Sequence, residues 1–140
     1  MKISHMMVAV HDQDEALAFY TEKLGFELRQ DMPLDKHRWV TVSPPGEDLE
    51  IVLIVPEMGP QSPEVAGRIR ELMALGALGA GILSVDDCRA AHRELVARGV
   101  EFTEEPVERF YGIDAGFRDP SGNPWRLTQI AAVPSAGVGR

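Results

Sequence analysis

The stretch "VAVHDQDEALAFYTEKLGFEL", Val8 to Leu28, returns in altered form as "ILSVDDCRAAHRELVARGVEF", Ile82 to Phe102. Each copy predicts a strand, a helix that begins after an aspartate, a glycine at the end of that helix, and a second strand. Asp12 and Asp87 are suited to cap a helix, because a short carboxylate accepts the free N–H groups of the first turn. Such self-similarity indicates a chain built from two copies of one unit.

Three extended segments follow each predicted helix. They lie at about 26–33, 37–43 and 49–55 in the first half and at about 101–108, 112–118 and 125–131 in the second. The turn-forming stretches "SPPGED" and "DPSGN" separate the last two segments of each half. The sequence therefore predicts an α+β fold of two βαβββ modules, at about 1–57 and 78–131.

The segment between the two modules predicts a helix of its own. Ser62 is suited to the N-cap, Pro63 to the first helical position and Gly76 to the end, which gives a linker helix over about 62–76. The small, glycine-containing tail 132–140 is expected to be mobile. We therefore expect the 140 residues to form one domain with a short tail.

The composition limits the classes of partner and location. The formal net charge of -8 makes nucleic acid an unexpected partner, because an acidic chain repels phosphate groups. No run of about 20 apolar residues predicts a membrane span, and the N-terminus lacks the full apolar region of a signal peptide. The single cysteine, Cys88, has no partner for an internal disulfide, which fits a reducing compartment. We expect a cytoplasmic protein.

The order of elements, with "HMMVAVHDQDEALAFYTEKLGF" and "GFRDPSGNPWRL", resembles the vicinal oxygen chelate superfamily. That group includes glyoxalase I, bleomycin-resistance proteins, fosfomycin-resistance enzymes and extradiol dioxygenases. The resemblance covers about residues 2–131 and implies a cup-shaped mixed sheet that binds a small molecule. It also implies a homodimer, because compact members pair their modules within or between chains. The helix at 62–76 and the outer strands are expected to carry that interface.

The resemblance also implies a test for a metal site. Catalytic members bind a divalent metal through a histidine on the first strand of each module and an oxygen donor on the last. His5 and Glu50 match two of these positions, but Ala80 and Arg126 occupy the other two, and neither donates a lone pair at neutral pH. The four-donor site is therefore expected to be absent and no cofactor is expected. A weaker, relocated metal site around His5 and Glu50 stays open.

Strand alternation sorts the remaining side chains between the cup and the helix side. Met6 is expected to pack under the first helix, and Glu50 is expected to pair with Arg126 across the cup. The residues expected to bind a ligand share cup-facing positions: His5, Met7, Trp39, Glu50, Val52, Asp114, Arg126 and Thr128. Apolar walls with a few polar groups are typical of small-molecule sites.

Several functions are compatible with this pattern. We favour a binding protein of the bleomycin-resistance kind, which holds a small organic compound without chemistry. A metal-dependent lyase, isomerase or dioxygenase is a second hypothesis, against which the missing donors count. A third is a metal-free enzyme in which His5 or Glu50 acts as general base and Arg126 holds an anion. A fourth is a non-catalytic subunit or regulator with a vestigial cup.

Overall fold

The computed structural model describes residues 1–131, so the tail 132–140 lies outside the described residues. The first module contains β1 (His5–Ala9), α1 (Gln13–Ala18), its π-helical continuation η1 (Phe19–Lys23), β2 (Glu27–Leu34), β3 (His37–Ser43) and β4 (Glu50–Ile54). The second contains β5 (Gly81–Ser84), α3 (Cys88–Ala97), β6 (Phe102–Arg109), β7 (Gly112–Arg118) and β8 (Pro124–Ile130). The 3-10 turn η2 (Pro56–Met58) and helix α2 (Pro63–Ala74) connect them. No helix within residues 1–131 has the length and apolar character needed to cross a membrane.

The two sheets share one topology. The first has the strand order β1-β4-β3-β2 and the second β5-β8-β7-β6, and in each the first strand pairs with the last in parallel. The other pairings are antiparallel. The predicted pair of βαβββ modules is therefore confirmed. Within residues 1–131, β1 and β5 each have a strand neighbour on one side only.

The local signals in the repeat act as the sequence predicts. The carboxylate of Asp12 accepts a hydrogen bond from the Glu15 N–H at 2.8 Å, and that of Asp87 accepts one from the Ala90 N–H at 3.0 Å. Gly25 ends the first helical segment at φ 77°, a left-handed conformation that glycine adopts at least cost. These contacts fix where each helix begins and ends.

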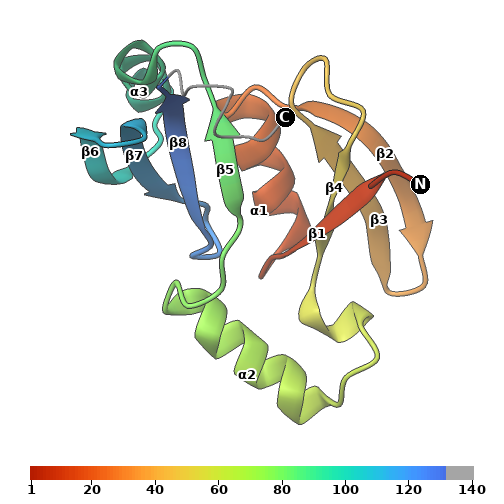
Figure 1. The fold of residues 1–140 in the computed structure, drawn as a ribbon. Helices are drawn as coiled ribbons and strands as arrows, with labels where there is room; N and C mark the ends of the chain where they lie inside the picture. The colour runs from red at the N-terminus through yellow and green to blue at the C-terminus, as the bar shows by residue number, and fades with distance from the viewer. Residues whose placement is uncertain (132–140) are drawn as a thin grey trace.

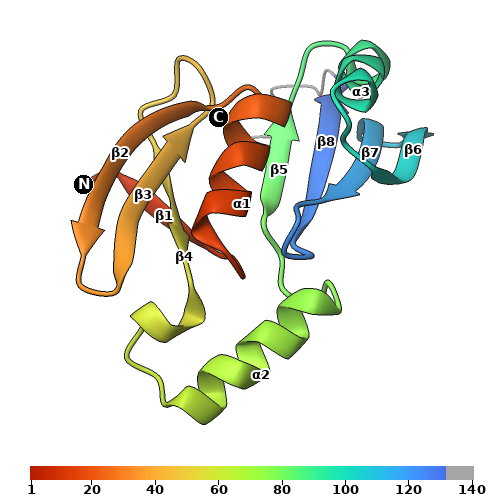
Figure 2. The ribbon, with the colours of Figure 1, turned by 180° about the vertical axis from the view of Figure 1, so that it is seen from behind.

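The modules face one another through their helix sides. Figures 1 and 2 show α1 between the two sheets from opposite directions. The rings of Phe19 and Phe117 lie 6.3 Å apart, and those of Tyr20 and Trp125 lie 6.1 Å apart. These residues belong to one buried cluster that draws on both sheets. Because the helix sides meet in one core, the opposite, cup-facing sides of the two sheets point away from each other.

The turn before β8 ties the second module to the first. The Tyr20 hydroxyl donates to Asp119 Oδ2 at 2.6 Å and accepts from Trp125 Nε1 at 2.9 Å. Asn123 Nδ2 donates to the Ala9 carbonyl at 2.6 Å. Burial, together with the neighbouring Asp119 carboxylate, raises the pKa of Tyr20 well above its ordinary value. The hydroxyl therefore stays protonated and continues to donate.

One expected core residue lies at the surface. Met6 is 53% exposed, so the expectation that it packs under the first helix is wrong. Met6 and Ile82 lie at the opening of a cavity of about 650 Å³ between the modules, which Ile51, Leu95 and Trp125 also line. The sequence could not indicate this gap, because it depends on the separation of β1 and β5 in space.

Replacing Tyr20 with phenylalanine removes the hydroxyl that joins Asp119 to Trp125. We expect the free energy of unfolding to fall by about 1–3 kcal/mol, because a buried polar group that loses its partner bears its desolvation cost. Urea denaturation followed by circular dichroism measures the change. Tyr111→Phe is the matched control, because Tyr111 donates to Asp114 at a partly buried position. An equal loss in both variants would contradict the role given to Tyr20.

Candidate functional site

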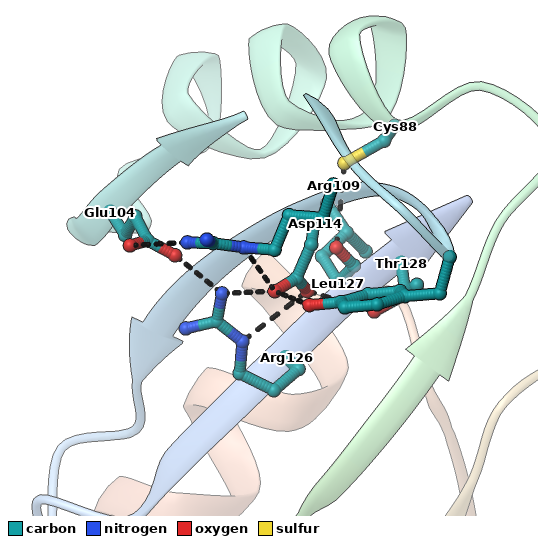
Figure 3. Close-up of polar contacts among 8 residues, drawn as sticks. Cys88, Glu104, Arg109, Asp114, Arg126, Leu127 and Thr128 are labelled. Atoms are coloured by element: carbon teal, nitrogen blue, oxygen red, sulfur yellow. Dashed lines mark hydrogen bonds and ion pairs between the residues drawn. The ribbon is translucent and has the colours of Figure 1, made fainter. Parts of the chain in front are cut away.

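The cup-facing side of the second sheet carries a network of charged side chains around Arg126. Its guanidinium donates from Nε to Asp114 Oδ1 at 3.3 Å, and its Nη2 donates to the other oxygen of Asp114 and to Glu104 Oε1. Thr128 donates to Asp114 Oδ1 at 2.9 Å. Figure 3 shows Arg126, Asp114 and Glu104 converging from three neighbouring strands. We call this surface, with Tyr111 and Arg109, the second half-cup.

Strand register explains why Arg126 can reach Glu104. Gly116 on β7 lies opposite Glu104 on β6 and opposite Arg126 on β8. A Cβ at position 116 would overlap with Nη1 of Arg126. The glycine therefore leaves the space across which the guanidinium lies. In the sequence, this arrangement is indicated by three residues at paired positions of adjacent strands: Glu104, Gly116 and Arg126.

The network neutralises its own charges. Burial opposes the ionised form of Asp114, but hydrogen bonds from Arg126, Tyr111 and Thr128 outweigh it and hold the pKa of the carboxyl below its ordinary value. Hydrogen bonds from Arg126 and then Arg109 lower the pKa of Glu104. Two carboxylates therefore face two guanidiniums. Arg126 has its charge matched within its own chain and is poorly placed to hold an anionic ligand.

The β6–β7 hairpin bends over this network. Arg109 forms an ion pair with Glu104 at 3.0 Å, and the Tyr111 hydroxyl donates to Asp114 Oδ2 at 2.8 Å. A hollow of about 270 Å³ lies beneath, lined by Ile82, Tyr111, Asp114, Arg126, Thr128 and Ile130. The second half-cup is therefore a small, partly apolar hollow with one side formed by hydrogen-bonded and ion-paired residues.

The cup-facing side of the first sheet carries a different group of residues, which we call the first half-cup. Thr41 donates to Glu50 Oε1 at 2.6 Å, and His5 Nε2 lies 3.8 Å from the same oxygen. The rings of His5 and Trp39 are 6.0 Å apart, and Trp39 Nε1 donates to Gln30 Oε1 at 2.9 Å. The Glu50 side chain is 17% exposed. Here a mostly buried carboxylate lies beside the His5 imidazole, which in turn lies near the Trp39 indole.

The predicted pairing of Glu50 with Arg126 is wrong within the chain. Each residue has partners on its own sheet, Thr41 and His5 for Glu50 and Asp114 and Glu104 for Arg126. The physical reason is the orientation of the sheets, whose cup-facing sides point in opposite directions. The structure therefore gathers the predicted residues into two separate groups instead of one.

The predicted cup residues differ in exposure. Met7 is 62% exposed on β1, whereas Val52 is fully buried and offers no free apolar surface, contrary to expectation. Asp114 and Thr128 are buried within their network. The role of these residues in ligand binding stays a prediction. Glu104 and Arg109 belong to the second half-cup although the sequence analysis does not select them as site residues.

The residues present do not fit the metal site of the family's catalytic members. In residues 1–131 no three side chains of His, Cys, Asp or Glu are grouped so that they could hold a metal ion. His5 lies opposite Glu50 on the neighbouring strand, but the residue opposite Arg126 is Ile82, and Ala80 precedes β5. Neither Ile82 nor Ala80 carries a donor atom in its side chain. His5 and Glu50 remain a pair, and most protein metal sites need at least three ligands.

Two βαβββ modules with paired half-cups of this kind define a glyoxalase-like fold. Residues 2–127 match the family described as Glyoxalase/Bleomycin resistance protein/Dioxygenase superfamily, and the chain belongs to this superfamily. The resemblance found in the sequence is confirmed.

Three relatives cover nearly the whole chain. The crystal structure of UcmS2 superposes with a TM-score of 0.86 at 44% identity, covering 91% of this chain and 97% of that chain. TnmS3 from Streptomyces sp. CB03234, described as an antibiotic binding protein, has a TM-score of 0.73 at 33% identity, with coverages of 94% and 97%. YurT of Bacillus subtilis (strain 168), described as uncharacterized, is 38% identical over 130 residues, which are 92% of this chain and 99% of YurT.

Gly116→Ala is expected to lower the free energy of unfolding by about 1–3 kcal/mol, because the added methyl group must displace the guanidinium of Arg126. In an Arg126→Ala background, the same substitution should cost at least about 1 kcal/mol less, which a double-mutant cycle by urea denaturation measures.

The control for this cycle is Gly67→Ala on α2, where, among residues 1–131, no atom outside the adjoining residues and the helix's own backbone lies within 4 Å of the added Cβ. Its effect should add to that of Arg126→Ala. If the destabilisation by Gly116→Ala also adds to that by Arg126→Ala, the steric contact between position 116 and Arg126 is contradicted.

Proposed function

We propose that the chain binds a small organic molecule in its cup, without the four-donor metal site of the family's catalytic members. The observation that carries the proposal is the network at Arg126, in which an internally paired guanidinium stands where those members have a metal ligand. The cup-facing surfaces carry the indole of Trp39, the hollow of the second half-cup and a few hydrogen-bonded polar groups. This is the composition of a binding site for a small, partly apolar molecule.

One relative supports this proposal. TnmS3 is described as an antibiotic binding protein, and it matches this chain over nearly its full length. A shared fold alone does not imply a shared ligand. The comparison therefore supports the class of function, binding of a small molecule, and the ligand of this chain has to be found by experiment.

We further propose that a complete cup forms between two copies of the chain. The half-cups of one chain point away from each other, so a ligand that touches both needs the second half-cup of another copy. The free edges of β1 and β5 are the surfaces suited to this pairing, since unpaired strand edges with exposed apolar residues favour association. Met7 and Ile82, 62% and 67% exposed, lie on these edges. A second copy would also cover the opening of the cavity between the modules.

A thermal-shift screen of tag-free protein against aromatic antibiotics and other small aromatic molecules tests the function. We expect hits whose stabilisation is lost in Trp39→Ala, because that change removes the indole ring of the first half-cup. Ala91→Leu is the comparison variant, since Ala91 lines the cavity between the modules. Hits that are lost in Ala91→Leu and kept in Trp39→Ala would contradict binding in the cup. One metal ion bound per chain through His5 and Glu50 would contradict the metal-free site.

The mode of assembly has a separate test. Size-exclusion chromatography with light scattering should give a dimer for the native chain and a monomer for Ile82→Asp, because a buried, unpaired carboxylate at the strand edge is costly. Leu72→Asp on α2 is the control, at a residue that is 43% exposed. A monomer from Leu72→Asp and a dimer from Ile82→Asp would instead support the interface on the 62–76 helix.

A further inference from the structure

Glu50 differs from the other carboxylates of the two half-cups in its partners. Asp114 and Glu104 each accept hydrogen bonds from a guanidinium. Glu50 receives one hydrogen bond, from the Thr41 hydroxyl, and within residues 1–131 no lysine or arginine nitrogen lies within ion-pair distance of it. Its side chain is 17% exposed, so its charge is only partly solvated. A half-buried carboxylate with one neutral donor retains unused capacity to accept hydrogen bonds.

The surroundings of Glu50 suit a positive charge. The imidazole of His5, 3.8 Å from the carboxylate, can accept as well as donate a hydrogen bond. The indole of Trp39 lies next to that imidazole and uses its N–H for Gln30, so its ring face is the part left to contact a ligand. Aromatic faces attract cations through their quadrupole. The carboxylate of Glu50 and the indole of Trp39 therefore both lie near the His5 imidazole.

Joining two half-cups does not remove the excess of negative charge. Together they hold more carboxylates than guanidiniums: Glu50, Glu104 and Asp114 against Arg109 and Arg126. Because Arg126 is already shared between two carboxylates, its presence beside Glu50 in a complete cup would still leave one negative charge unmatched. The chain as a whole also carries a formal net charge of -8. An anionic ligand would be repelled by the excess of carboxylates in the cup and by the net negative charge of the chain.

We infer that the molecule bound in the cup is an organic cation, with a protonated amine that pairs with Glu50 and an aromatic or apolar body that lies on Trp39. This inference rests on the proposed function, since it names the chemical class of ligand for the same site. The charge of this ligand is opposite to the one considered from the sequence, where Arg126 would hold an anion.

Three probes with one ring system separate charge from shape: 2-naphthylmethylamine, 2-naphthylmethanol and 2-naphthoate. Isothermal titration of the full chain at neutral pH should show the amine binding about ten- to a hundred-fold more tightly than the alcohol, with the naphthoate weakest. A hydrogen bond between charged groups accounts for a factor of that size. In Glu50→Gln, which can still accept from Thr41, the amine and the alcohol should bind within about three-fold of each other.

Glu71→Gln is the matched control, since Glu71 is exposed on α2 and the substitution removes the same charge far from the cup. It should keep the preference for the amine. A preference that survives Glu50→Gln, or an alcohol or naphthoate that binds as tightly as the amine, would overturn the inference. If the binding of these probes is lost in Trp39→Ala, the proposed function still stands. Absence of any binding that depends on Trp39 would count against the proposed function and the inference together.

Discussion

The packing of the two helix sides against each other is the constraint on which the rest of the structure depends. Tyr20 lies at its centre, where its ring contacts Trp125 and its hydroxyl joins Trp125 to Asp119. The turn that contains Asp119 also holds Asn123 against the backbone of β1. Because these groups are buried and mutually satisfied, they hold the two sheets in one relative orientation. That orientation turns both cup-facing surfaces outward and separates His5 and Glu50 from Arg126.

Because the two cup-facing sides point away from each other, each half-cup has its own set of charge partners. On the second sheet, Arg126 and Arg109 pair with Asp114 and Glu104 next to Gly116, so the charges of this surface are matched within the chain. On the first sheet, the partners of Glu50 among the described residues are a hydroxyl and an imidazole. The same fold thus carries one neutralised surface and one surface with an unmatched carboxylate. A ligand that spans both would take its orientation from this difference.

An arginine at the position of a metal ligand depends on several other residues around it. An arginine at position 126 needs carboxylates beside it, space for its guanidinium and a strand register that brings these together. Asp114, Glu104 and Gly116 supply these conditions on the two neighbouring strands. In the second half-cup, ion pairs with Asp114 and Glu104 therefore hold the guanidinium at the position where the family's catalytic members have a metal ligand.

The sequence by itself determined the elements and their order, because caps such as Asp12 and Asp87, helix-ending glycines and strand alternation act over a few residues. It also determined that Arg126 and Asp114 share a face of the sheet, and that two of the four positions which carry metal ligands in the family's catalytic members, those of Ala80 and Arg126, carry no donor. It did not determine the pairing of Arg126 with Glu104, which depends on strand register, nor the exposure of Met6, which depends on the gap between β1 and β5. The largest error, the pairing of Glu50 with Arg126, came from treating two cup-facing surfaces as one. Only the tertiary structure decided that point, because the relative orientation of two sheets is set by packing in the shared core and leaves no periodic pattern in either strand.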